Sequence, residues 1–150
     1  MEITPELKEK LDLLHQKYAA LGEDFNAYLE GLLYADVTTY WDYIQLDTLL
    51  SLQKPKTSFP DEVVFIMYHQ ITELYFKLAL REFEALGTIV NPEKKHFINR
   101  VTRINRYFDA LVKSFEIMIN GMDREEFLKF RMSLLPASGF QSAQYREIEI

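Results

Sequence analysis

Cysteine is absent from the 150 residues, which excludes disulfides, zinc–thiolate sites, iron–sulfur clusters and thiol nucleophiles from this chain. Glycine and proline are scarce, with five of each, so turns should be few and elements long. No apolar run approaches the length that spans a membrane, and the first residues lack the basic and apolar regions of a signal peptide. These absences predict a soluble protein, which we expect in the cytoplasm.

Basic residues are also in the minority, with 17 Lys and Arg against 23 Asp and Glu. The resulting net charge of −6 argues against a nucleic-acid-binding protein, which usually has a basic face. The length suits one domain. Aromatic residues reach 14%, which suits a core built around a flat ligand and equally a core that uses Phe for volume.

Apolar residues recur at helical spacing in three stretches of the first 60 residues. Thr4-Pro5-Glu6 has the residues of a helix start, and the stripe that follows stops at Gly22. A second helix is expected over 25–33, and a short one over 46–53. The segment Val37–Ile44 is β-branched and aromatic, so a short strand or an extended loop is possible there. Residues 54–60 form the clearest loop, with two Pro.

The remaining residues predict four more helices. The first runs from Pro60 to Gly87 and is apolar on every face over 63–68, so it should lie centrally. The second, capped by Asn91-Pro92-Glu93, keeps a 4-3 spacing to Gly121 that should pack one face throughout. Asp123 caps a shorter helix, and a loop over 136–142 leads into a last helical pattern. Because no residue closes that pattern before Ile150, we expect the sequence to be cut from a longer helix.

The three histidines have different surroundings in the sequence. His15 has charged neighbours and is expected on the surface. His96 completes a Glu-x-x-His pair with Glu93, but di-iron bundles need two such pairs and two more Glu, so a metal site is not favoured. His69 lies in the apolar helix, with Phe65 and Glu73 one turn away on either side. It is either a core histidine satisfied by a hydrogen bond, or a neutral imidazole that faces a ligand cavity.

Three further features admit both a structural and a functional interpretation. Arg131 follows Phe127 by four residues, so it either reaches water or a nearby acid, or binds a ligand carboxylate through its planar guanidinium. Ser138-Gly139 suits a turn and lacks the strand and flanking glycines of a nucleophile elbow. Glu73 and Lys77 are spaced as an ion pair on one helix face and need no function.

Three long segments, 39–55, 61–77 and 127–146, resemble the tryptophan 2,3-dioxygenase family. The specific strings are Phe-Ile-x-x-His-Gln at 65–70 and Phe-Arg followed by Pro-Ala-Ser-Gly-Phe-Gln-Ser at 130–142. Their order and spacing also fit, and the resemblance extends from about Thr38 to the end. It implies an all-α, long-helix bundle that uses ferrous haem and O2 to open the indole ring of L-tryptophan. The product would be N-formylkynurenine, in the first step of the kynurenine route, and the family's assembly implies a homotetramer.

The resemblance also implies roles for individual residues. His69 matches the distal histidine, which accepts a hydrogen bond from the indole N–H, and Arg131 matches the arginine that binds the substrate carboxylate. Ser138 and Gly139 match a loop close to the haem. The other residues implied in substrate binding are Phe65, Ile66, Met67, Tyr68 and Phe127 in the same pocket, and Tyr40, Tyr43 and Ile44 in a segment that covers a neighbouring subunit's site.

The resemblance leaves half of the site without a counterpart. The family's proximal haem-ligating histidine and its ammonium-binding threonine match no residue here, so no metal ligand is expected in this chain. We therefore expect 1–150 to be the N-terminal, distal-side part of one dioxygenase domain: N-terminal helices over 1–36, a substrate-covering segment over 37–60 and distal-side helices over 61–150. The rest would be a second chain or a segment missing from this sequence.

Two other functions compete with this interpretation. One is a helical oligomerisation or regulatory module that has lost haem, and the other is a haem oxygenase for a different indole substrate. The combination of Phe65, His69 and Arg131 argues against the module, which has no need of a carboxylate-binding residue. Arg131 also favours an amino acid over a bare indole.

Overall fold

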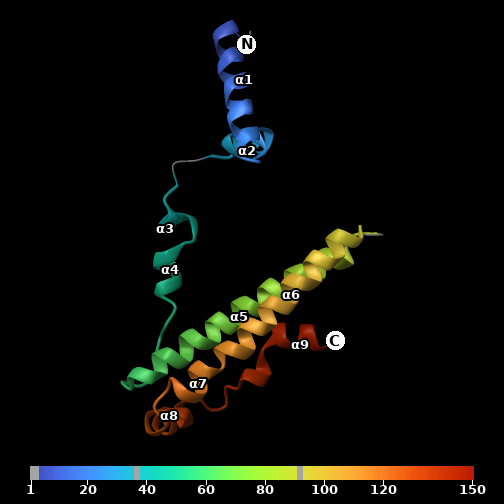
Figure 1. The fold of residues 1–150 in the computed structure, drawn as a ribbon. Helices are drawn as coiled ribbons and strands as arrows, with labels where there is room; N and C mark the ends of the chain where they lie inside the picture. The colour runs from blue at the N-terminus through green and yellow to red at the C-terminus, as the bar shows by residue number, and fades with distance from the viewer. Residues whose placement is uncertain (1–3, 36–37, 91–92) are drawn as a thin grey trace. The chain divides into compact units, whose positions relative to one another are not determined.

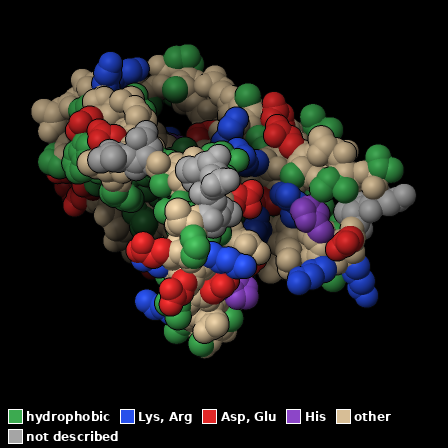
Figure 2. All heavy atoms as spheres, turned by 90° about the horizontal axis from the view of Figure 1, so that it is seen from above, with side chains coloured by type: hydrophobic (Ala, Val, Ile, Leu, Met, Phe, Trp, Pro, Cys, Tyr) green, Lys and Arg blue, Asp and Glu red, His purple; other side chains and the backbone are tan. Residues whose placement is uncertain are grey.

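The computed structural model describes residues 4–35, 38–90 and 93–150. Every regular element in these ranges is a helix, which confirms the predicted all-α class. The chain forms two compact units, Met1–Asp47 and Thr48–Ile150 (Figure 1). Within the described ranges, no helix is long and apolar enough to cross a membrane. On the face seen in Figure 2, acidic and basic side chains are interspersed.

The first unit begins with α1 (Pro5–Ala20) and α2 (Phe25–Leu33). The Thr4 hydroxyl caps α1 by accepting from the Leu7 N–H at 3.3 Å. Gly22 ends this helix as predicted, at a φ of +74°, a left-handed conformation that glycine adopts without steric cost. Phe25 is buried, with Tyr18 stacked on it at 5.7 Å between ring centroids.

The next element, α3 (Tyr40–Tyr43), is a single helical turn, so a strand through Ile44 is not formed. Thr39 caps this turn, because its hydroxyl accepts from the Asp42 N–H at 3.2 Å. A local cap of this kind outweighs the strand preference of β-branched and aromatic residues. Val37, where the predicted segment starts, lies outside the described residues. After α3, α4 (Leu46–Leu50) leads into the second unit.

The second unit is built around α5, which runs over Pro60–Gly87 as predicted. It packs against α6 (Lys94–Ser114), α7 (Glu116–Asn120), α8 (Arg124–Phe130) and α9 (Ala143–Glu149). Figure 1 shows α5 and α6 side by side and antiparallel. The central position expected for α5 is confirmed.

The single helix predicted up to Gly121 is interrupted at Phe115, where α6 ends and α7 begins. The Ser114 hydroxyl donates to the Leu111 carbonyl at 2.8 Å, and serine hydroxyls that bond to helix carbonyls often bend or end a helix. The face is also not packed throughout, since Phe97 and Phe115 are 48% and 54% exposed. At the other end Glu93 is the N-cap residue, and the predicted cap residues Asn91 and Pro92 lie outside the described residues.

Buried Glu62 holds the loop over 54–60 against the start of α5. Its side chain is 1% exposed and accepts from the N–H groups of Lys56 and Thr57, each at 2.7 Å, and from the Thr57 hydroxyl. Burial acts to raise the pKa of the Glu62 carboxyl, but the Thr57 and Lys56 hydrogen bonds and the Lys56 charge outweigh it, so the pKa lies below its ordinary value. The loop is thus fixed through an ionised carboxylate.

The far end of α5 carries an ion-pair cluster with α6. Glu82 is buried and accepts from Arg100 at 2.7 Å and from Arg103 at 3.2 Å. Arg100 also donates through Nε to Nε2 of His96 at 2.7 Å. His96 is therefore a hydrogen-bond acceptor within an ion-pair cluster. Among the described residues no group of three or more His, Cys, Asp or Glu could hold a metal ion.

Two clefts and an aromatic cluster around His69

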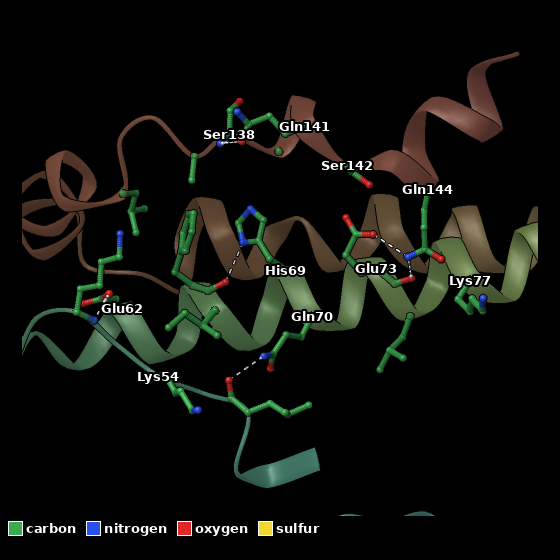
Figure 3. A pocket seen from close by; sticks show the side chains of 18 of the residues that line it. Lys54, Glu62, His69, Gln70, Glu73, Lys77, Ser138, Gln141, Ser142 and Gln144 are labelled. Carbon is green, nitrogen blue, oxygen red and sulfur yellow. Dashed lines mark hydrogen bonds between the residues drawn. The ribbon is translucent and has the colours of Figure 1, made fainter. Parts of the chain in front are cut away.

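Two clefts in the second unit meet at α5. Cleft A, of about 740 Å³, lies between α5, residues 49–56 and residues 134–144, whereas cleft B, of about 670 Å³, lies between α5, α6 and residues 138–145. The residues common to both are His69, Glu73, Ser138 and Gly139. In Figure 3 the His69 ring points from α5 toward the segment that carries Ser138 and Gln141.

The hydrogen bonding of His69 determines which ring nitrogen is free. Its Nδ1 lies 2.8 Å from the Phe65 carbonyl oxygen (Figure 3). A carbonyl oxygen only accepts, so Nδ1 carries the hydrogen and, in the neutral ring, Nε2 is left as an acceptor. His69 is thus half-buried, bonded within its own helix, and lines both clefts; its role toward a ligand stays a prediction.

Aromatic rings pack around the Phe65 ring, which in turn contacts the His69 ring. The Phe65 centroid lies 4.1 Å from that of His69, 6.2 Å from that of Phe127 and 5.8 Å from that of Phe130. Phe130 is fully buried and meets Phe127 edge-on at 5.5 Å. Sequence reasoning did not name Phe130 as part of this site, although its spacing of three from Phe127 on one helix signals a shared face.

The start of α5 fixes α8, which carries Phe127. The Asp61 carboxylate accepts from the Asp123 N–H, and the Asp61 N–H donates to Glu126 at 3.3 Å. Asp123 caps α8 as predicted, by accepting from the Glu126 N–H at 2.9 Å. In addition, Lys56 Nζ donates to the Ser133 carbonyl at 3.2 Å. These contacts hold Phe127 and Phe130 against Phe65.

Of the two interpretations of Arg131, the structure shows the guanidinium exposed, where it can reach water; binding of a ligand carboxylate stays a prediction. Its Cζ lies 5.8 Å from the centroid of the Phe127 ring, and it lines neither cleft. The reason is local: α8 ends at Phe130, and the chain continues as a 3-10 turn, η1 (Arg131–Leu134). The guanidinium is thus at the edge of the aromatic cluster, where a ligand anion can reach it.

The other expected site residues are divided between the two clefts and the surface. Ile66 lines cleft A, and Tyr68 lines cleft B with its hydroxyl 3.4 Å from Ser114 Oγ. Met67 is 38% exposed and lines neither. Tyr40 and Tyr43 belong to α3 and are exposed, and Ile44 is the C-cap residue of that helix. All three lie in the first unit, so their role stays a prediction.

Ser138 and Gly139 lie at a capped turn, η2 (Gly139–Gln141). The Ser138 hydroxyl accepts from the Phe140 N–H at 3.3 Å, and the Gln141 side chain accepts from the Ser138 N–H at 3.1 Å.

Glu73 does not pair with Lys77 as expected, and its carboxylate instead accepts from Gln144 at 2.7 Å. Sequence spacing could not indicate this contact, because it joins residues that are 71 positions apart.

Cleft B has the composition that a flat, apolar ligand needs. Leu111 and Val112 of α6 line it, together with six rings besides that of His69: Tyr68, Phe76, Phe108, Phe115, Phe140 and Tyr145. Tyr145 closes one side, with its ring 5.7 Å from Phe76. The apolar lining and the imidazole at its edge fit one face of a porphyrin.

Comparison with known proteins agrees with the resemblance seen in the sequence. The family described as tryptophan 2,3-dioxygenase matches residues 31–150. The chain belongs to this family. Tryptophan 2,3-dioxygenase of Ruegeria sp. (strain TM1040) is 38% identical over 117 residues, which are 77% of this chain and 42% of the relative. The enzyme of the same name from Bacillus cereus (strain ATCC 10987 / NRS 248) is 39% identical over 112 residues, 74% of this chain and 40% of the relative.

The chain therefore spans about two fifths of the length of the curated dioxygenases it matches. The part shared with the tryptophan 2,3-dioxygenase family contains His69, the aromatic cluster and the capped turn at Ser138. Membership of the family confirms the resemblance drawn from the strings at 65–70 and 130–142.

Proposed function

We propose that the protein containing this chain is a haem-dependent dioxygenase that opens the indole ring of L-tryptophan with O2, giving N-formylkynurenine. The observation that carries the proposal is the free Nε2 of His69, beside the Phe65 ring and between the two clefts. The relatives bear the name of this activity.

The His69 geometry suits an indole better than a non-aromatic substrate. An indole N–H donates one hydrogen bond, and a neutral imidazole whose Nδ1 is already engaged offers a single acceptor for it. The Phe65 ring supplies a flat apolar surface one helical turn away. In this proposal His69 orients the indole by accepting a hydrogen bond from its N–H, and it does not need to remove that proton.

Arg131 provides the charge that an amino-acid substrate requires. Its guanidinium lies at the edge of the aromatic cluster, above Phe127. A planar guanidinium binds a carboxylate through two parallel hydrogen bonds. The proposal is that the substrate carboxylate binds Arg131 while the indole ring reaches His69.

Cleft B would hold one face of the haem, with Ser138 and Gly139 at its edge. When bound, haem supplies the iron that activates O2. The residues of this chain would line the haem, and the residue that binds its iron would come from another part of the protein. A homotetramer, or a second chain with the remaining half of the site, would complete the enzyme, and Tyr40, Tyr43 and Ile44 would then cover a neighbouring site.

The test compares tryptophan with 1-methyltryptophan, which has no indole N–H, in the full-length protein loaded with haem. His69→Ala should lower kcat/KM for tryptophan roughly tenfold to a hundredfold, the effect of one lost hydrogen bond in an apolar site. Turnover of 1-methyltryptophan should change much less, because that substrate cannot make the bond.

The matched control is His15→Ala, which changes an exposed histidine in α1. It should leave both substrates unaffected. An equal loss for the two substrates in His69→Ala would contradict the orienting role, and no tryptophan turnover by the unmodified protein would contradict the proposed function itself.

A further inference from the structure

One polar contact between α5 and α9 lies next to His69 and has no part in the proposed chemistry. Gln144 Nε2 donates to the Glu73 carboxylate at 2.7 Å and to the Glu73 main-chain carbonyl at 3.0 Å (Figure 3). Glu73 follows His69 by one helical turn, and Gln144 is the second residue of α9. Both side chains are half-buried.

The residues before α9 depend on few other polar contacts. Residues 135–141 are all exposed, and the hydrogen bonds of η2 stay within that turn and its flanks. Among the described residues, no hydrogen bond other than the two from Gln144 joins 135–150 to α5. Gln144 follows Ser142 by two positions and follows Gln141, the last residue of the turn η2, by three.

We propose that Glu73 and Gln144 are positioning residues that hold the Ser138–Gly139 turn at its place over His69. The four residues that line both clefts are two from α5 and two from this turn. The Glu73–Gln144 pair joins α5, which carries the first two, to α9, which follows the turn that carries the other two. It therefore determines the width of the junction where an indole in cleft A would meet a flat cofactor in cleft B. This role in turnover rests on the proposed function.

The pair is also chemically selective, because a carboxylate and a main-chain carbonyl are both acceptors. Only a donor at position 144 satisfies them together. Gln144→Glu has the same shape but offers oxygens alone, so it loses both bonds and faces the Glu73 carboxylate with like charge. In Glu73→Gln the new amide oxygen still accepts from Gln144, so both bonds remain.

These differences define a set of variants of the full-length, haem-loaded protein. Gln144→Glu should lower kcat for tryptophan roughly tenfold or more, with KM changed less than about threefold, since small displacements at a reacting junction reduce rates strongly. Glu73→Gln, which keeps both bonds, should lower kcat much less than Gln144→Glu does. The double variant should recover part of the loss, because the new amide at 73 donates to the new carboxylate at 144 while the main-chain bond stays absent.

Amide hydrogen exchange supplies a measurement that does not depend on activity. In Gln144→Glu, amides over 139–142 should exchange roughly tenfold faster, whereas those within α5 keep their rates. Glu147→Gln, at an exposed position of α9, is the matched control and should change neither kinetics nor exchange. The proposal is overturned if the amides over 139–142 exchange at unchanged rates in Gln144→Glu, or if those of α5 exchange equally faster. It is also overturned if Glu73→Gln lowers kcat as much as Gln144→Glu does. If the unmodified protein does not oxidise tryptophan, the proposed function fails, and exchange still decides whether the pair holds the turn.

Discussion

At the scale of single residues, the three histidines show how the hydrogen-bond partner decides the role. His15 has an aromatic neighbour, Phe25, at 6.2 Å and is exposed. His96 accepts from Arg100 in an ion-pair cluster. His69 bonds through Nδ1 to the carbonyl of its own helix, which leaves Nε2 as an acceptor in the neutral ring. Only the third has both a fixed ring and an open acceptor beside a cleft, which is what orienting a substrate requires.

Arg131 allows a prediction at this scale. Arg131→Leu in the full-length, haem-loaded protein should raise KM for tryptophan roughly tenfold to a hundredfold, because a charge-assisted, two-point contact is lost. Binding of indole, which has no carboxylate, should change little. Substrate titrations with both ligands measure the difference.

Arg124→Leu is the control, since Arg124 is an exposed arginine at the first position of α8. It should leave both ligands unaffected. Equal losses for tryptophan and indole in Arg131→Leu would show that the residue acts through packing rather than through the carboxylate.

At the scale of elements, capping residues at helix ends explain several of the boundaries. Thr4 and Asp123 cap their helices through side-chain oxygens, and Gly22 ends α1 through its left-handed backbone. These signals are local, so the sequence predicts them well. The break at Phe115 is the exception, because Ser114 within an apolar repeat does not by itself indicate where a helix stops.

Glu62 connects a loop to a helix and makes folding depend on pH. Its pKa is lower in the folded protein than the ordinary value of 4.5, so the ionised form favours the folded state. That stabilisation is present above about pH 4.5 and is lost as the pH falls through the folded-state pKa. Glu62→Gln should destabilise the protein by about 1–3 kcal/mol at neutral pH and flatten the acid side of the stability profile.

Urea unfolding of the full-length protein at several pH values checks this prediction. Glu84→Gln, at an exposed position of the same helix, should keep both the stability and its pH dependence. An unchanged acid limb in Glu62→Gln would mean that Glu62 does not contribute to it.

At the scale of the whole molecule, the core is small for the number of large apolar side chains. Among the described residues the buried hydrophobic side chains are Phe25, Tyr68, Ala79, Ile104 and Phe130. Along α5 the exposed ones are Met67, Ile71, Leu74, Leu78 and Phe83. Exposed apolar rows of this kind are suited to contact with further protein, and the relatives are more than twice as long as the matched part.

Phe130 is the side chain on which this small core depends most directly. It is fully buried between Phe65 and Phe127, so Phe130→Ala should cost about 3–5 kcal/mol of unfolding free energy through lost burial and a cavity. Leu128→Ala, on the exposed side of the same helix, should cost less than about 1 kcal/mol. Urea unfolding measures both, and similar values for the two variants would contradict the assignment of Phe130 to the core.

The sequence by itself determined the all-helical class, the bounds of α5, the caps at Thr4 and Asp123, and the family. These depend on apolar periodicity, on side chains within one turn of each other and on long specific strings, all of which are readable along the chain. Only the tertiary structure decided that Arg131 is exposed, that Glu73 bonds to Gln144 rather than pairing with Lys77, and that His69 lies between two clefts. The exposure of Arg131 follows from the end of α8 at Phe130. The other two follow from contacts between residues far apart in sequence, which the spacing of residues within one segment does not reveal.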